Sequence, residues 1–169
     1  LWHTDPREKG WGFSVRQAAT PAASEGTIFV GTSDGALLAF NAHDGSMKWS
    51  RRLGDPREQV YDVDTTPLIV DGKLYTATAD GRLFHVNASD GRTVWETDAG
   101  GTGDILLFKD QLYASGGGVL SAVDPQSGHL LWTQSFEAPG ISSPAASASI
   151  LAVVSSTKTS SGSSAETSG

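Results

Sequence analysis

The 169-residue sequence contains no cysteine, only one methionine and no long apolar run. Without cysteine the chain has no disulfide, no thiolate zinc site and no thiol nucleophile. Without a long apolar run the sequence predicts no transmembrane segment. Leu1-Trp2 reads as part of a strand rather than a basic leader, so we expect the native start of the protein to lie upstream.

Positive charge is also scarce: the chain has 12 lysines and arginines and 19 aspartates and glutamates, which gives a formal charge of −7. An acidic surface repels phosphate backbones, which argues against a nucleic-acid partner. Hydrophobic residues make up 38% and charged residues 18%, a composition typical of a globular protein. The 20 glycines indicate many tight turns between short strands.

One pattern recurs along the chain. Thr-Pro, Gly, Asp-Gly, Leu, Asn-Ala, a second Asp-Gly and Trp occur in this order between 20 and 49, and again between 66 and 95. The two copies are 46 residues apart throughout. A third copy ends at Trp132, and a fourth opens at Ser143-Pro144. The sequence therefore contains three complete repeats and part of a fourth.

Each repeat has the pattern of four short antiparallel strands. In the second copy we expect strands at 66–70, 74–78, 82–87 and 93–96, joined by three Asp-Gly turns. Such a sheet cannot bury both faces alone, so neighbouring copies must stack. Radially stacked four-stranded sheets form a β-propeller.

The predicted fold is thus all-β, a β-propeller of four-stranded antiparallel blades that forms a portion of a 7–8-bladed ring. We assign a partial propeller to 1–155 and a flexible Ser/Gly-rich tail or loop to 156–169. The expected blades are 17–52, 63–98, 103–135 and 141–155, with 1–4 as a stray outer strand. We expect the remaining blades to belong to a longer chain; the alternative is that copies associate to close the ring.

The repeat Asp-Gly-x-Leu … Asn-x-x-Asp-Gly-x-x-x-Trp resembles that of pyrroloquinoline-quinone (PQQ)-type propellers. In that family the tryptophan of the outer strand docks against the neighbouring blade. The resemblance implies docking roles for the tryptophans and for the glycine four residues before each: Trp49, Trp95, Trp132, Gly45, Gly91 and Gly128.

Within that family, 65–75 and 130–135 are similar to blades of the BamB-type propellers, lipoproteins of outer-membrane β-barrel assembly. The resemblance implies a non-enzymatic scaffold that mediates protein–protein interaction in the periplasm. It also implies a lipid anchor upstream of Leu1 and binding to the periplasmic domains of the barrel-assembly machinery.

Two other functions stay open at this point. The first is an extracytoplasmic sensor or ligand-binding domain with the same repeats. The second is a fragment of a quinoprotein dehydrogenase, a class that uses a catalytic aspartate, bound calcium and usually paired cysteines. This chain lacks cysteine, and the turn role accounts for the Asp-Gly aspartates, so we predict no catalytic residue, no enzyme activity and no cofactor.

The sequence also predicts no metal site. The four histidines are scattered without paired spacing, and we expect His85 to be a semi-buried, hydrogen-bonded side chain. Asp62 and Asp64 lie where a central channel would open, and we interpret them as solvated acids rather than cation ligands.

A charged motif recurs in two of the connections between blades, once at 5–8 and once at 55–58. Both connections should emerge on one rim of the propeller. The motif is either a favourable turn inherited with the repeat or part of a surface that binds a partner. Trp11 lies in the first connection and is either an interaction residue or core filling. The candidate partner-facing residues are Asp5, Arg7, Glu8, Trp11, Asp55, Arg57 and Glu58.

Overall fold

The computed structural model describes residues 20–53, 62–63, 65–99, 103–137, 141–147 and 150–152. Within these ranges the chain forms strands and turns, and no described segment is a helix that could cross a bilayer. The stray strand expected at 1–4, the tail at 156–169 and all seven candidate partner-facing residues lie outside the described residues.

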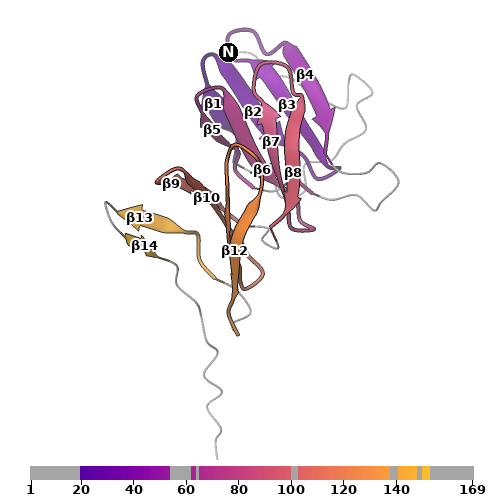
Figure 1. Ribbon diagram of the computed structural model, residues 1–169. Coiled ribbons are helices and arrows are strands. Elements are labelled where there is room, and N and C mark those ends of the chain that lie inside the picture. The colour runs from indigo at the N-terminus through magenta and orange to yellow at the C-terminus, as the bar shows by residue number, and fades with distance from the viewer. Residues whose placement is uncertain are drawn as a thin grey trace, which may run out of the picture.

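The described strands form three four-stranded antiparallel sheets and one hairpin, each in sequence order (Figure 1). The first sheet contains β1 (Ala22–Ser24), β2 (Thr27–Gly31), β3 (Ala36–Asn41) and β4 (Met47–Arg52). The second contains β5 (Leu68–Val70), β6 (Lys73–Ala77), β7 (Arg82–Asn87) and β8 (Thr93–Asp98). The third contains β9 (Ile105–Phe108), β10 (Gln111–Gly116), β11 (Val119–Val123) and β12 (Leu130–Ser135). The hairpin consists of β13 (Ala145–Ser147) and β14 (Ile150–Ala152).

This arrangement is the predicted one: three complete propeller blades and part of a fourth. In blade two, the expected strand at 82–87 is β7 itself, and the other three strands differ from expectation only at their ends. The apolar innermost strand β5 is half-buried rather than buried. It is the edge strand of its sheet and has a hydrogen-bonded neighbour on one side only.

The turns between strands explain why aspartate and glycine recur. At the first turn of blade two, Asp71 and Gly72 have φ of 50° and 73°, the left-handed geometry of a tight hairpin. At the third turn of blade one, the Asp44 carboxylate accepts hydrogen bonds from the backbone N–H and the hydroxyl of Ser46, at 2.9 and 2.7 Å. These bonds lower the pKa of Asp44. The aspartates thus serve the turns, as the sequence predicts.

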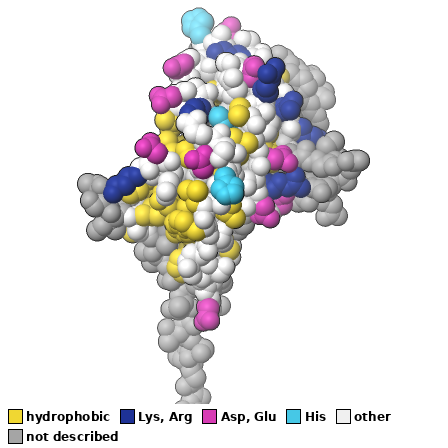
Figure 2. Space-filling view, viewed as in Figure 1, with side chains coloured by type: hydrophobic (Ala, Val, Ile, Leu, Met, Phe, Trp, Pro, Cys, Tyr) yellow, Lys and Arg dark blue, Asp and Glu magenta, His cyan; other side chains and the backbone are white. Residues whose placement is uncertain are grey.

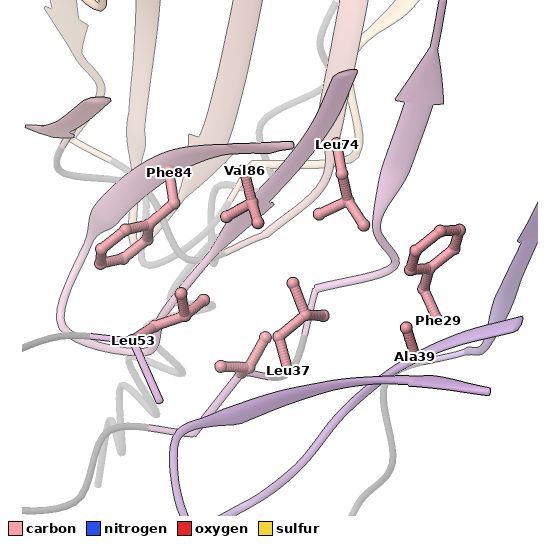
Figure 3. Packing of buried hydrophobic residues seen from close by; sticks show 8 residues of the cluster. Phe29, Leu37, Ala39, Leu53, Leu74, Phe84 and Val86 are labelled. Atoms are coloured by element: carbon pink, nitrogen blue, oxygen red, sulfur yellow. The ribbon is translucent and has the colours of Figure 1, made fainter. Parts of the chain in front are cut away.

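The hydrophobic core lies between blades rather than within them. Strand alternation sends Phe84 and Val86 of β7 toward blade one, while Leu83 faces blade three. Figure 3 shows the first interface, where Phe29 and Leu37 of blade one meet these side chains. Each described blade is therefore held by its neighbours, which is the physical reason that a single repeat cannot fold alone.

Each outer strand carries a β-bulge at the same place. The register shifts after Ala39 in blade one, after His85 in blade two and after Ala122 in blade three. Each of these residues lies opposite the tryptophan of its blade. The bulge therefore sets the orientation of a residue that contacts the next blade.

Candidate functional site

The junction of blades one and two is centred on Trp49 of β4. Its indole Nε1–H donates a hydrogen bond to the Ala88 carbonyl oxygen, at 3.0 Å, in the last turn of blade two. The ring lies over Gly91 so closely that a Cβ built on this glycine would be 2.7 Å from the indole Cε3. Gly91 also has a φ of 72°, so both the space and the backbone favour glycine here.

The junction of blades two and three repeats this geometry. The Nε1–H of Trp95 donates to the Pro125 carbonyl oxygen at 3.2 Å. A Cβ built on Gly128 would be 2.6 Å from the Trp95 Cδ2, and Gly128 has a φ of 74°. The structure therefore brings each of these tryptophans to a glycine of the following blade.

The other two residues predicted for docking stand at corresponding positions. Gly45 occupies the same turn in blade one, with a φ of 71° and its N–H bonded to the Asn41 carbonyl oxygen at 2.9 Å. Trp132 of β12 packs on Tyr113, with ring centroids 5.9 Å apart, and remains 41% exposed.

The sequence did not reveal the carbonyl oxygens that accept from the indoles. They belong to Ala88 and Pro125, each three residues before the contacted glycine. The fixed spacing of this turn was visible in the sequence, but a backbone acceptor leaves no side-chain signature. The turn itself is held by its acidic residue: in blade three the Asp124 carboxylate accepts from the Ser127 hydroxyl and backbone N–H, both at 2.7 Å. These bonds lower the pKa of Asp124.

His85 makes the second junction chemically different from the first. The corresponding residues of blades one and three are alanines, Ala39 and Ala122. The His85 ring is 5.0 Å from that of Tyr75 and 5.6 Å from that of Trp95, between centroids. It is only 7% exposed, and its Nδ1 has no hydrogen-bond partner. Our expectation of a hydrogen-bonded histidine is therefore wrong for Nδ1.

Charge and burial perturb two groups in this stack. Burial, and then the nearby Lys73 ammonium, lower the pKa of His85 below its ordinary value. Burial, and then the Asp124 carboxylate, raise the pKa of the Tyr75 hydroxyl. The Tyr75 and Trp95 rings are also 6.0 Å apart, so the three rings form a triangle of contacts, in which a neutral imidazole packs as a flat, largely apolar group.

A cleft opens at each of the two junctions. The cleft between blades one and two has a volume of about 300 Å³ and is lined by residues that include Glu25, Lys48 and Asn87. The cleft between blades two and three measures about 310 Å³ and includes Asp71 and Lys73. Both have mixed charge, and their repetition follows from the repetition of the blades.

The described residues contain no group of three or more histidines, aspartates or glutamates placed to hold a metal ion. Of the two acids expected near the central channel, Asp62 is described and Asp64 lies outside the described residues. Arg82 of β7 pairs with Asp80, with 2.9 Å between Nε and a carboxylate oxygen.

Comparison with known proteins identifies the relatives of this chain. A family model described as outer membrane protein assembly factor BamB matches residues 1–149 and 80–168. The crystal structure of BamB from Moraxella catarrhalis matches with a TM-score of 0.73 and 27% identity, over 85% of this chain and 46% of that one. This chain thus spans about half the length of that relative. No curated protein sequence matches.

Two further structures show the fold alone. Quinohemoprotein alcohol dehydrogenase from Comamonas testosteroni matches with a TM-score of 0.61 and 23% identity, over 73% of this chain and 21% of that one. The computationally designed protein Ika4 matches with a TM-score of 0.65 and 13% identity, over 84% of this chain and 89% of that one.

Proposed function

Because the chain belongs to the BamB family of PQQ-like repeat propellers, we propose that it is a non-enzymatic scaffold for protein–protein interaction in outer-membrane β-barrel assembly. The match to BamB carries this proposal, since it combines a family model over most of the chain with a TM-score of 0.73. The dehydrogenase match, at 23% identity, supports the fold and does not extend to activity.

The chemistry of the described residues agrees with a scaffold. Two of the Asp-Gly and turn aspartates are engaged locally, because Asp44 and Asp124 accept hydrogen bonds from their own turn residues. Trp49 and Trp95 engage the neighbouring blade. By repetition, we propose that Trp49, Trp95 and Trp132, with Gly45, Gly91 and Gly128, have a structural docking role. Such docking makes a rigid surface on which loops can present binding residues.

The family membership also supports a proposal for location and partners. We propose that the protein works in the periplasm, anchored to the outer membrane by a lipid upstream of Leu1, and binds the periplasmic domains of the barrel-assembly machinery. The blade boundaries 17–52, 63–98, 103–135 and 141–155 belong to this proposal, as does the partner-facing role of 5–8, Trp11 and 55–58. We propose that a longer chain supplies the remaining blades, and association of copies to close the ring is the alternative.

Genetic complementation tests the proposal. The full-length protein that contains this chain is expressed in a bacterium from which the BamB gene has been deleted. Recovery of outer-membrane barrel proteins, together with co-purification of the barrel-assembly machinery, is the expected result. A stable protein that restores no barrel assembly and retains no component of that machinery would rule the function out.

A further inference from the structure

The junction of blades two and three contains a buried nitrogen without a partner. The His85 side chain is 7% exposed, and its Nδ1 has no hydrogen-bond partner among the described residues. Most buried polar groups in folded proteins are hydrogen-bonded. On the face shown in Figure 2, lysine, arginine, aspartate and glutamate side chains stand at the surface, where water solvates them. A proton taken up by His85 would be a charge without such solvation.

One carbonyl oxygen of blade three accepts two hydrogen bonds from blade two at this junction. The Pro125 oxygen accepts from the Trp95 indole N–H at 3.2 Å and from the Tyr75 hydroxyl at 3.4 Å. Both donors are ring neighbours of His85, with centroids 5.6 and 5.0 Å from it. His85 also shares a face of β7 with Leu83, which packs on blade three. Hydration of the imidazole therefore requires movement of side chains that bind Pro125.

The junction of blades one and two has the same backbone arrangement without a titratable group at this place. Phe29 and Ala39 are paired there in the register in which Tyr75 and His85 are paired in blade two. Phenylalanine has no hydroxyl to donate, and alanine accepts no proton. The Trp49 indole still donates across the junction, at 3.0 Å. The two junctions thus share the tryptophan contact and differ in the histidine.

The charged and titratable groups around the ring stack come from both blades: Asp71, Lys73, Tyr75, Asp110, Asp124 and His129. Burial, and then the Lys73 ammonium of β6, lower the pKa of His85. The Asp124 carboxylate acts on the Tyr75 hydroxyl and accepts a hydrogen bond from the Ser127 hydroxyl of its own turn. The surroundings of His85 therefore oppose a positive charge while the junction is closed.

We propose that acid opens the junction of blades two and three selectively. Protonation of His85 releases the last turn of blade three, residues 124–129, from Trp95 and Tyr75, while the junction of blades one and two stays closed. The imidazolium becomes hydrated once this turn has moved. Tyr75 and Asp124 line the same cleft from different blades, so opening also changes the shape of that cleft. The inference goes beyond the proposed scaffold function and does not depend on it.

Proton linkage gives the direction and the size of the effect. A hydrated His85 in the open junction has the ordinary pKa of 6.5, whereas the closed junction lowers it. Above pH 6.5 neither form holds the proton, and the closed form keeps its full advantage. Between 6.5 and the lowered pKa only the open form is protonated, so its population rises about tenfold for each pH unit. Below the lowered pKa both forms are protonated and the rise ends.

The indole N–H groups of Trp95 and Trp49 are matched reporters, because each is bonded across one of the two junctions. Their hydrogen exchange is followed by NMR in the full-length protein that contains this chain, with the tryptophan nitrogens labelled. The pH series runs from about 7.5 to about 5.5, and the rates are corrected for the pH dependence of intrinsic exchange. We expect protection of the Trp95 N–H to fall up to about tenfold per pH unit below 6.5, and protection of Trp49 to stay constant.

Two variants remove the titrating group and keep different amounts of packing. His85→Phe retains an aromatic ring, and His85→Ala introduces the residue found at Ala39 and Ala122 of the neighbouring blades. Both should abolish the pH dependence at Trp95. Tyr75→Phe is the matched control, because it removes one hydrogen bond across the junction and leaves the histidine. It should lower protection at every pH and retain the dependence on pH.

Three results would overturn the inference. Equal loss of protection at Trp49 and Trp95 would show that acid acts on the whole fold rather than on one junction. Constant protection at Trp95 down to the pH of acid unfolding would show that this junction does not open. A pH dependence that persists in both His85 variants would assign the proton to another group, with His129 the first to be replaced.

Discussion

The indole of Trp49 lies on Gly91 of the next blade, and a Cβ at that glycine would approach the Cε3 atom to 2.7 Å. This contact joins two repeats that are each incomplete as folding units. It also places a large aromatic ring where backbone, rather than side chain, must form the opposing surface.

Gly91→Ala should therefore be strongly destabilising. The added methyl overlaps the indole and also forces alanine into a φ of 72°. We expect the free energy of unfolding to fall by about 3 kcal/mol, from overpacking and backbone strain together. Urea unfolding measures the change. Gly72→Ala is the matched control, because Gly72 has a φ of 73° with open space around it, and it should cost only about 1 kcal/mol. Equal losses in both variants would contradict the contact.

Trp49→Phe tests the hydrogen bond to the next blade. Phenylalanine keeps an aromatic ring but leaves the Ala88 carbonyl oxygen without the indole donor. We expect a loss of about 1–2 kcal/mol in the free energy of unfolding, and the same for Trp95→Phe. Trp132→Phe is the control, since the 41% exposed Trp132 should tolerate the change within about 0.5 kcal/mol. Thermal or urea unfolding ranks the three, and a larger effect at Trp132 than at Trp49 would refute this account.

The stability of the protein should fall in mild acid because of His85. Its pKa is lowered in the folded chain, from an ordinary value of 6.5, so below pH 6.5 the unfolded chain binds a proton that the folded chain resists. The contribution of His85 is thus complete above pH 6.5 and is lost as the pH falls toward the lowered pKa. The Lys73 ammonium adds to the resistance, since it disfavours a second positive charge nearby.

His85→Ala provides the test, because alanine stands at this position in the blades on either side. The substitution opens a cavity and lowers stability at every pH, but it should flatten the dependence on pH below 6.5. Urea unfolding across a pH series measures the slope. A slope that persists in His85→Ala would place the titrating group elsewhere.

Gly31→Ala should disrupt the path of the chain between blades one and two. A Cβ at Gly31 would be 2.2 Å from the Val63 carbonyl oxygen, and the backbone there cannot yield without moving the linker. The Val63 N–H is bonded to the Thr32 carbonyl oxygen at 3.1 Å, which fixes this approach. We expect a loss of about 2–3 kcal/mol on urea unfolding. Gly117→Ala, at a turn with open space, should cost about 1 kcal/mol, and a loss at Gly31 no larger than this would contradict the close approach.

Much of the architecture could be predicted from the sequence because its signals are local and repeated. Asp71-Gly72 specifies a hairpin by itself, through the positive φ that both residues adopt. The period-two alternation of a strand at 82–87 places Phe84 and Val86 on one face and Leu83 on the other, and the structure has them in separate core clusters. Recurrence of the motif, at a spacing of 46 residues between the first two copies, then extended one blade to its neighbours.

The sequence did not predict which glycine of a neighbouring blade each tryptophan contacts. The sequence places Gly45 four residues before Trp49, but the ring contacts Gly91, 42 residues later. That choice depends on the rotation between neighbouring sheets and on the bulge that orients the outer strand. Neither is encoded in a short run of residues.

The sequence by itself thus determined the strands, the turns and the number of repeats, because hydrogen-bonded hairpins and side-chain alternation act over a few residues. Only the tertiary structure decided what meets across a junction. It placed the Ala88 carbonyl oxygen against an indole N–H, and it packed His85 against Tyr75 and Trp95 with its Nδ1 unpartnered. Those contacts come from close packing of separate sheets, where the surroundings of each atom depend on residues far away in the chain.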